Sequence, residues 1–458
     1  MTLRTKLLTA AGFVVAVSGL LLAASWYYCI SVKAQPSTDY TVQLRTAARD
    51  AFPSENAPLF PAFVDIVSEF PRLAAIYAAT LPADVDIDVD AVLDGTTDES
   101  NRLRVEAVFE YLRTHGAFDT TAYLPQLEGA LRDYDPSTPL IAVLMPEIGA
   151  TRSMTRFQTM RLDKAIVAND VKAATAALRE SLVASRILAQ QGGMFDTVVS
   201  LAARQMLAKQ ITRRAVCGDL SPQLADALLV ELLDDSRSYS LVRAVSSERL
   251  TVLDTLQHVY TDDGTGDGYA IVHEILRLRD PESNPSRWVN ISGPFLAPRK
   301  VVESEVNAYF DRLTAAADLP FQQRMDLDLD PQRSLRDSIN YIVLELLSMD
   351  LAKAARTRDQ SEASYNAALI VCAAEVFRGR HGHYPATLAD FKDLLPPSAT
   401  KDTFANNAEL LYIATDNGYS LWSTGTDGDH DQGLVAPYDV RAYLGEVQID
   451  GDVCLISK

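Results

Sequence analysis

Apolar residues return every three or four positions along most of this chain, which is the spacing of an amphipathic helix. Between residues 169 and 191, one apolar stripe consists of Val171, Ala174, Leu178 and Leu182. Asn169 or Asp170 can cap the start of this helix, and Gly192-Gly193 can end it. The same spacing predicts helices over 194–216, after Pro222, and over 246–260 and 350–380. Because the first three are joined by short links, we expect antiparallel neighbours in a helical-bundle or repeat-like body.

Two stretches interrupt the helical spacing. Residues 82–90 alternate acidic and apolar positions, which predicts a short edge strand or an extended loop. Residues 279–299 contain four prolines, and proline removes the backbone donor that a helix interior needs. We therefore expect a long connection here, wrapped over the helical body.

The spacing changes to that of strands near the C-terminus. Residues 409–414 and 419–423 are rich in β-forming side chains, and Asp416-Asn417-Gly418 lies between them. Asn-Gly between two such runs is a strong hairpin signal, because both residues tolerate the left-handed backbone of a tight turn. We expect a small α+β head with an antiparallel sheet, entered by the long helix over 350–380.

The N-terminus contains an uncharged run over residues 7–32, preceded by Arg4 and Lys6. A helix of about 20 apolar residues crosses a bilayer, so this run is long enough for a transmembrane anchor. Trp26 and Tyr27 lie where aromatic side chains meet the membrane surface. The basic flank stays in the cytoplasm, so the bulk of the chain is expected to be extracytoplasmic, in the periplasm.

A removable signal peptide is the alternative interpretation of this N-terminus. Val32-Lys33-Ala34 can serve as a small-x-small cleavage site. The apolar core of a removable signal, however, runs for only about 7 to 15 residues. The longer run over 7–32 therefore favours a single-pass anchor in the inner membrane.

Length and charge limit the classes of protein to which the chain can belong. A chain of 458 residues exceeds one ordinary hydrophobic core. We expect a cytoplasmic tail with the anchor over 1–35, an extracytoplasmic helical domain over 36–350, and a long helix with the head over 351–458. The formal net charge of −19 argues against nucleic acid or anionic lipid as a partner, because both bind clustered Lys and Arg.

The segment over residues 364–433 resembles the globular head of the major pseudopilin of type II secretion. The shared features are a helix ending near Arg378, the His-Gly-His-Tyr-Pro turn over 381–385, the paired strands, and an acidic Gly-rich loop over 425–433. The whole chain is similar to bacterial envelope proteins that combine an anchor, a helical middle and such a head. A pseudopilin has Glu where this chain has Val17, which argues against assembly into a pilus-like fibre.

The acidic loop of the head is a candidate calcium site. Asp427, Asp429 and Asp431 place carboxylates at alternate positions after Gly425. Such spacing with glycine turns lets several oxygens converge on a hard cation such as calcium. The resemblance implies the same role, because the equivalent pseudopilin loop binds calcium, and it matches Asp427 and Asp429. A solvated polar turn is the other interpretation.

A second acidic loop partly matches the calcium-binding loop of an EF-hand. Asp263, Asp267, Gly268 and Glu274 occupy positions one, five, six and twelve of that pattern. Position three is Thr265, where Asp or Asn is usual, and the loss of one carboxylate weakens affinity. The alternative is a Gly-rich loop that joins two helices without a metal.

The sequence contains none of the short motifs that mark common enzyme classes. The serine-hydrolase elbow Gly-x-Ser-x-Gly, the zinc motif His-Glu-x-x-His and the phosphate loop ending Gly-Lys-Ser/Thr do not occur. We expect a membrane-anchored extracytoplasmic structural or interaction protein with a calcium-stabilised head, whose partners are envelope or secretion proteins. The alternatives are an envelope hydrolase with a site in the helical body, and a component of a pseudopilus.

Overall fold

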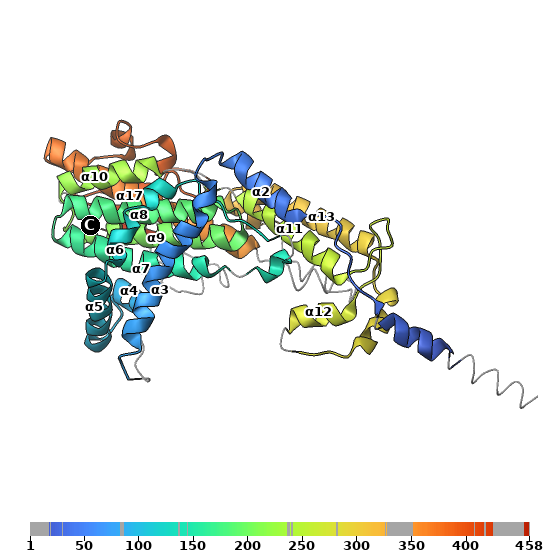
Figure 1. The fold of residues 1–458 in the computed structure, drawn as a ribbon. Helices are drawn as coiled ribbons and strands as arrows, with labels where there is room; N and C mark the ends of the chain where they lie inside the picture. Colours follow the sequence, from blue (N-terminus) through green and yellow to red (C-terminus); the bar gives the residue numbers. More distant parts are fainter. Residues whose placement is uncertain are drawn as a thin grey trace, which may run out of the picture.

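A computed structural model describes residues 18, 20–29, 31–82, 87–135, 138–143, 145–235, 239, 241–280, 283–325, 327, 351–406, 408–415, 418–424 and 453–457. These residues form an elongated, mainly helical molecule with one small antiparallel sheet (Figure 1). The predicted mainly α class, with a small antiparallel sheet near the C-terminus, is confirmed.

Long helices form a central bundle around a shared apolar core. They are α7 (Pro146–Val167), α8 (Val171–Gln190), α9 (Met194–Val216), α10 (Pro222–Asp234) and α17 (Leu351–His381). Asp170 caps α8 by accepting a hydrogen bond from the Ala173 amide. Gly192, at a φ of 82°, takes the left-handed backbone that lets the chain turn into α9. The prediction that α8, α9 and α10 pack as neighbours is confirmed, because α8 contacts both α9 and α10.

The head packs directly on this bundle. Its sheet has the order β1 (Leu411–Ala414), β2 (Tyr419–Ser423), β3 (Val453–Ser457), and all pairs are antiparallel. The short helices η6 (Leu388–Phe391) and η7 (Pro397–Thr400) connect α17 to it. The predicted hairpin is confirmed, whereas β3 was not expected. Tyr419 and Leu421 are buried in the same core as α8, α10 and α17, so no gap in the core separates the head from the body at residue 351.

A second group of helices lies against α7 on one flank of the bundle (Figure 1). It consists of η1 (Ala57–Leu59), α3 (Phe60–Ala78), α4 (Val89–Asp94), α5 (Glu99–Thr114), α6 (Ala117–Thr121) and η2 (Leu124–Leu127). Its core is rich in aromatic rings, among them Phe70, Phe109 and Phe118. The expected strand or loop over 82–90 is wrong at its end, because Asp88 caps a helix that begins at Val89.

The other end of the molecule is built around α11 (Leu241–Val259). It also contains α2 (Tyr40–Ala51), η3 (Leu140–Ala142), α12 (Val272–Arg279), η4 (Arg287–Phe295) and α13 (Arg299–Ala317). The short helix α14 (Phe321–Met325) follows α13, and its Phe321 packs with Ala363 of α17 and with Phe404. The expected long connection over 279–299 is partly wrong, because residues 287–295 of it form the 3₁₀ helix η4. A 3₁₀ helix tolerates Pro294 near its end, where the ladder of hydrogen bonds is short.

Half of the predicted membrane span over 7–32 lies outside the described residues, namely 7–17, 19 and 30. Of the remainder, residues 18, 20–29 and 31 are helical, and they extend from the end that carries α12 (Figure 1). Among the residues that the structure describes, no helix is both long enough and apolar enough to span a membrane.

Candidate functional site

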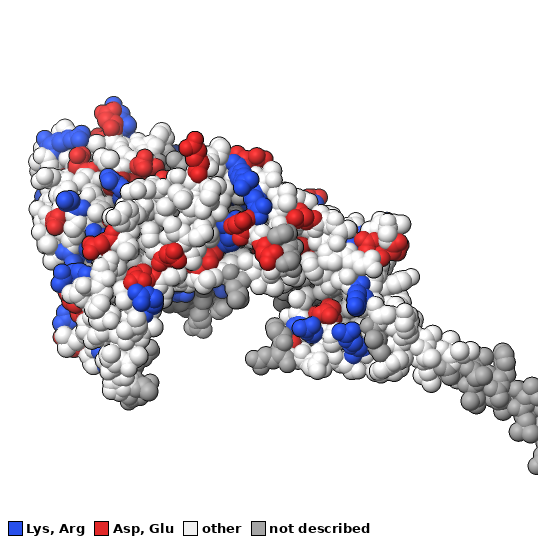
Figure 2. Space-filling model, viewed as in Figure 1, with Lys and Arg blue, Asp and Glu red and all other residues white. Residues whose placement is uncertain are grey.

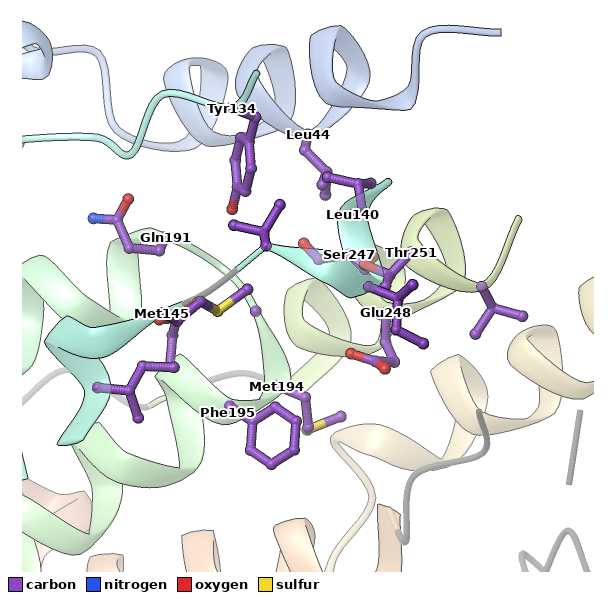
Figure 3. A pocket seen from close by; sticks show the side chains of 16 residues that line it. Leu44, Tyr134, Leu140, Met145, Gln191, Met194, Phe195, Ser247, Glu248 and Thr251 are labelled. Atoms are coloured by element: carbon purple, nitrogen blue, oxygen red, sulfur yellow. Dashed lines mark hydrogen bonds between the residues drawn. The ribbon is translucent and has the colours of Figure 1, made fainter. Parts of the chain in front are cut away.

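A pocket of about 400 Å³ lies where the central bundle meets the α11 end of the molecule (Figure 3). Its walls come from α2, the first turn of α9, α11, and the segment 134–148 that crosses between them. Cavities of this size are large enough for a small organic molecule or for a side chain of a partner. Four parts of the chain that are separate in sequence therefore build one concave site.

Most of the wall is apolar. The apolar lining residues are Leu44, Leu140, Ile141, Val143, Met145, Ile148, Met194, Phe195 and Val252. The ring of Phe195 is exposed although it follows the buried Met194 at the start of α9. Methionine side chains adapt to ligands of different shape, and an exposed aromatic ring at a pocket supplies apolar contact area. The pocket is therefore suited to an apolar group.

Glu248 places a single carboxyl group in this apolar surround. It projects from α11 into the pocket (Figure 3). Within the described part of the chain, its carboxylate has neither a hydrogen-bond donor nor a basic partner. Burial disfavours the charged form, and it raises the pKa of Glu248 from 4.5 to about 7. The pocket thus contains an acid that changes its charge near neutral pH.

The position of Glu248 in α11 was visible in the sequence but was not recognised. Val245 and Val252 are buried on the core face of α11. Glu248 lies three residues after Val245 and four before Val252, which places it in the same stripe. A charged residue in an otherwise apolar stripe is the signal that indicates this site.

A buried ion network holds the side of the pocket next to the bundle. The Arg132 guanidinium donates to Asp196 at 2.7 and 3.1 Å and to Glu147 at 2.8 Å. It also donates to the Tyr134 hydroxyl at 3.3 Å. Gln191 accepts a hydrogen bond from the Arg132 amide at 2.6 Å. These bonds fix the crossing segment against α7 and α9.

The network also sets the charge of its members. Burial by itself lowers the pKa of Arg132, but the neighbouring Asp196 and Glu147 charges outweigh burial and raise this pKa. Burial raises the pKa of Tyr134, so its hydroxyl keeps its proton over the physiological range. Asp196 lines the pocket but is satisfied by Arg132. Glu248 therefore differs from Asp196, the other acid in the lining, because Asp196 has a counter-ion.

The described lining contains little that could perform a chemical step. Its hydroxyl groups are those of Tyr134, Ser247 and Thr251, and the Thr251 hydroxyl donates to the Ser247 carbonyl at 3.2 Å. The described lining residues include no histidine, cysteine or lysine. A nucleophile needs a nearby base to activate it, and Glu248 makes no hydrogen bond with these hydroxyls in the described part of the chain. The arrangement supports binding of a ligand more than its conversion.

The predicted EF-hand-like loop is a tight turn between α11 and α12. The Asp263 carboxylate accepts hydrogen bonds from the Thr265 amide at 2.8 Å and the Thr265 hydroxyl at 2.7 Å, and these bonds lower the pKa of Asp263. The Asp267 carboxylate accepts from the amides of Gly268 at 2.8 Å and Lys300 at 3.1 Å. Asp267 thereby caps the first turn of α13. Both carboxylates thus have structural partners within the protein.

Glu274, the third predicted ligand, pairs with Arg277 at 3.3 Å in α12. Among the residues that the structure describes, no group of three or more His, Cys, Asp or Glu side chains is arranged to hold a metal ion. Asp427, Asp429 and Asp431 lie outside the described residues. Calcium binding in either loop therefore stays a prediction from the sequence.

Comparison of the chain with models of protein families, with curated proteins and with solved structures finds no match. The resemblance of the head to pseudopilins therefore stays a prediction as well. The structure describes the elements on which that resemblance is based, namely α17, the turn over 381–385 and the β1–β2 hairpin.

Proposed function

We propose that this chain is an extracytoplasmic interaction protein, anchored in the inner membrane through residues 7–32, whose helical body binds a partner in the Glu248 pocket. The partner inserts an apolar group that carries a positive charge, such as a lysine or arginine with its aliphatic stem. Envelope or secretion proteins are the partners that the proposed location offers. The head is a second, calcium-stabilised interaction surface, and this part rests on the sequence pattern of the loop 425–433.

The observation that carries the proposal is the unpaired acid in an apolar pocket. A partly buried carboxylate without a counter-ion loses hydration, and a cation that enters the pocket relieves that cost. The aliphatic stem of such a group gains apolar contact with Met145, Met194 and Phe195 at the same time. A neutral ligand of the same shape gains only the apolar contact and does not relieve the cost of the carboxylate charge.

An envelope hydrolase with its site in the helical body is the second candidate. The pocket that such an enzyme needs is present, but its described lining offers no nucleophile paired with a base. A pseudopilus component is the third candidate, and Val17 in place of the pseudopilin Glu weighs against it. Binding of a charged apolar group is the function best supported by the geometry.

A pair of small probes tests the pocket in the full-length chain, held in phospholipid nanodiscs. We expect 4-phenylbutylamine to bind and 4-phenylbutanol to bind more weakly, with both measured by calorimetry against empty nanodiscs. Glu248→Gln should remove the preference for the amine and leave the alcohol unchanged. Equal affinity of the unmodified chain for the two probes, or an unchanged preference in Glu248→Gln, would contradict the proposal.

The anchor is tested separately by fractionation of cells that produce the full-length chain. We expect the chain to stay with the membranes after an alkaline wash, because a membrane-spanning helix resists such washing. A protease added to the periplasmic side should digest the body. Recovery in the soluble fraction, with an N-terminus after Ala34, would show that residues 7–32 are a removed signal.

A further inference from the structure

The 3₁₀ helix η4 exposes three large apolar side chains, while its buried residues are Asn290 and Gly293. Residues three apart lie on the same side of a 3₁₀ helix. Asn290 and Gly293 form the buried side. Trp288 and Ile291 share another side and are 41% and 47% exposed, and Phe295 at the end of η4 is 84% exposed. Large apolar side chains that lie this exposed and this close together in the chain indicate a contact surface.

The buried side of η4 explains why this orientation is fixed. The Asn290 side chain accepts a hydrogen bond from the His273 amide at 2.8 Å. A Cβ atom at Gly293 would lie 2.1 Å from the Ala270 carbonyl oxygen, so only glycine fits. Rotating η4 to bury Trp288 would break these contacts with α12 and the preceding loop. The outward apolar face is therefore a built feature of the fold.

The same face is joined to the N-terminal helix. The ring of Trp26 lies 5.0 Å from that of Trp288, and Asn290 donates a hydrogen bond to the Cys29 carbonyl at 3.3 Å. Trp26 is itself 49% exposed. Trp26, Trp288, Ile291 and Phe295 together form what we call the base patch. Figure 1 shows this part at the end of the molecule opposite α10.

The length of the proposed anchor fixes the depth of the base patch. Residues 7–26 of the uncharged run make 20 residues, and about 20 helical residues cross the hydrocarbon layer. Trp26 therefore lies at the outer membrane–water boundary, where tryptophan and tyrosine are enriched. The contact between Trp26 and Trp288 holds η4 at the same depth.

We propose that the base patch is embedded in the outer interfacial layer of the phospholipid bilayer that the anchor crosses. In this arrangement η4 is the part of the body that contacts the membrane. This inference rests on the anchor of the proposed function. Apolar and aromatic residues on one face of a short helix, lying in the plane of the interface, are typical of such contacts. Exposed basic side chains also lie in the region of α12 (Figure 2), among them Arg277, which pairs with Glu274.

Other occupants of the patch are a second copy of the chain and a different protein. Neither is favoured, because the contact with Trp26 places η4 beside the lipid. The proposal needs no anionic lipid, which agrees with the net charge of −19. Uncharged phosphatidylcholine vesicles are therefore the appropriate test membrane.

The test places an environment-sensitive fluorophore at the patch of the full-length chain in phosphatidylcholine vesicles. The variant is Phe295→Cys in a Cys217→Ser, Cys454→Ser background, because Cys217 is exposed and would also react, and because Cys29 and Cys372 are buried. Tyr123→Cys in the same background is the matched control, since Tyr123 is exposed on the body, in the turn before η2. We expect lipids that carry a quencher on the upper acyl chain to remove most of the fluorescence at 295 and little at 123.

Three results would overturn the proposal or its basis, and they can be told apart. A label at 295 that stays in water, in a chain that resists alkaline washing of the vesicles, overturns the base patch and leaves the anchor intact. A label that is shielded from water but not quenched by lipid shows a protein partner, which also overturns the proposal. Loss of the chain from the vesicles shows that the anchor itself is wrong.

Discussion

The Glu248→Gln substitution tests the electrostatics of the pocket without any knowledge of its ligand. Glutamine has nearly the same shape as glutamate and cannot ionise. In the folded chain, burial raises the pKa of Glu248 from 4.5 to about 7. The folded state therefore binds a proton more strongly than the unfolded state, and the acid destabilises the fold as pH rises from about 4.5 through 7.

The size of this effect follows from the difference between the two pKa values. At about 1.4 kcal/mol per pH unit, the difference between 4.5 and about 7 corresponds to at most about 3.5 kcal/mol. The side chain is partly exposed at the pocket, so solvent screening reduces the penalty, and we expect about 2 kcal/mol. Glu248→Gln should thus stabilise the chain by about 2 kcal/mol at pH 8, and its advantage should vanish near pH 4.5.

Urea unfolding of the full-length chain in one detergent, followed by circular dichroism at several pH values, measures this difference. Glu305→Gln is the matched control, because Glu305 is exposed on α13, and we expect no pH-dependent difference for it. The reasoning would be refuted if the free energies of unfolding of Glu248→Gln and of the unmodified chain differed by the same amount at all pH values. A variant that is less stable than the unmodified chain at pH 8 would refute it as well.

Three further predictions concern stability. Arg132→Met leaves Glu147 and Asp196 buried without their cation and should lower the free energy of unfolding by about 3 to 5 kcal/mol. The control Arg45→Met breaks a pair with the exposed Asp133 and should lower it by under about 1 kcal/mol. Similar losses for the two variants in urea unfolding would contradict the stabilising role of the network. Asp402→Ala removes the acceptor for the Ser423 hydroxyl and for the Thr424 and Phe404 amides, and it should lower the free energy of unfolding by about 2 to 3 kcal/mol. The control Asp393→Ala, at an exposed position, should change it little. Equal melting temperatures for the two variants would contradict this prediction. Calcium should raise the melting temperature of the full-length chain, and a temperature unchanged by calcium or chelator would rule out both acidic loops as sites.

Local signals in the sequence predicted much of the helical body and the hairpin. Asp170 and Gly192 bound α8 because a cap and a left-handed turn are properties of single residues. The turn before β2 is equally local. By contrast, β3 pairs with β2 from some thirty residues away, and nothing in residues 453–457 specifies that partner.

The pocket could not be predicted because its parts meet only in the folded chain. Leu44, Met145, Phe195 and Glu248 lie on four separate segments, and each alone is an ordinary residue of its helix or loop. The acids that the sequence did emphasise, Asp263 and Asp267, serve the turn and the start of α13 instead. A run of acidic residues indicates a site only when the fold leaves the carboxylates without partners.

The contact between Cys29 and Asn290 closes a loop of 261 positions, and a similar contact joins Thr38 to Gln257 across 219. In the proposed orientation, export begins with the N-terminal helix. The partner residues Gln257 and Asn290 leave the translocation channel only much later. Closure of a contact over so long a separation is slow, because the intervening chain must first be ordered. If the anchor is as proposed, the segment that enters the bilayer first is therefore among the last to complete its contacts with the body.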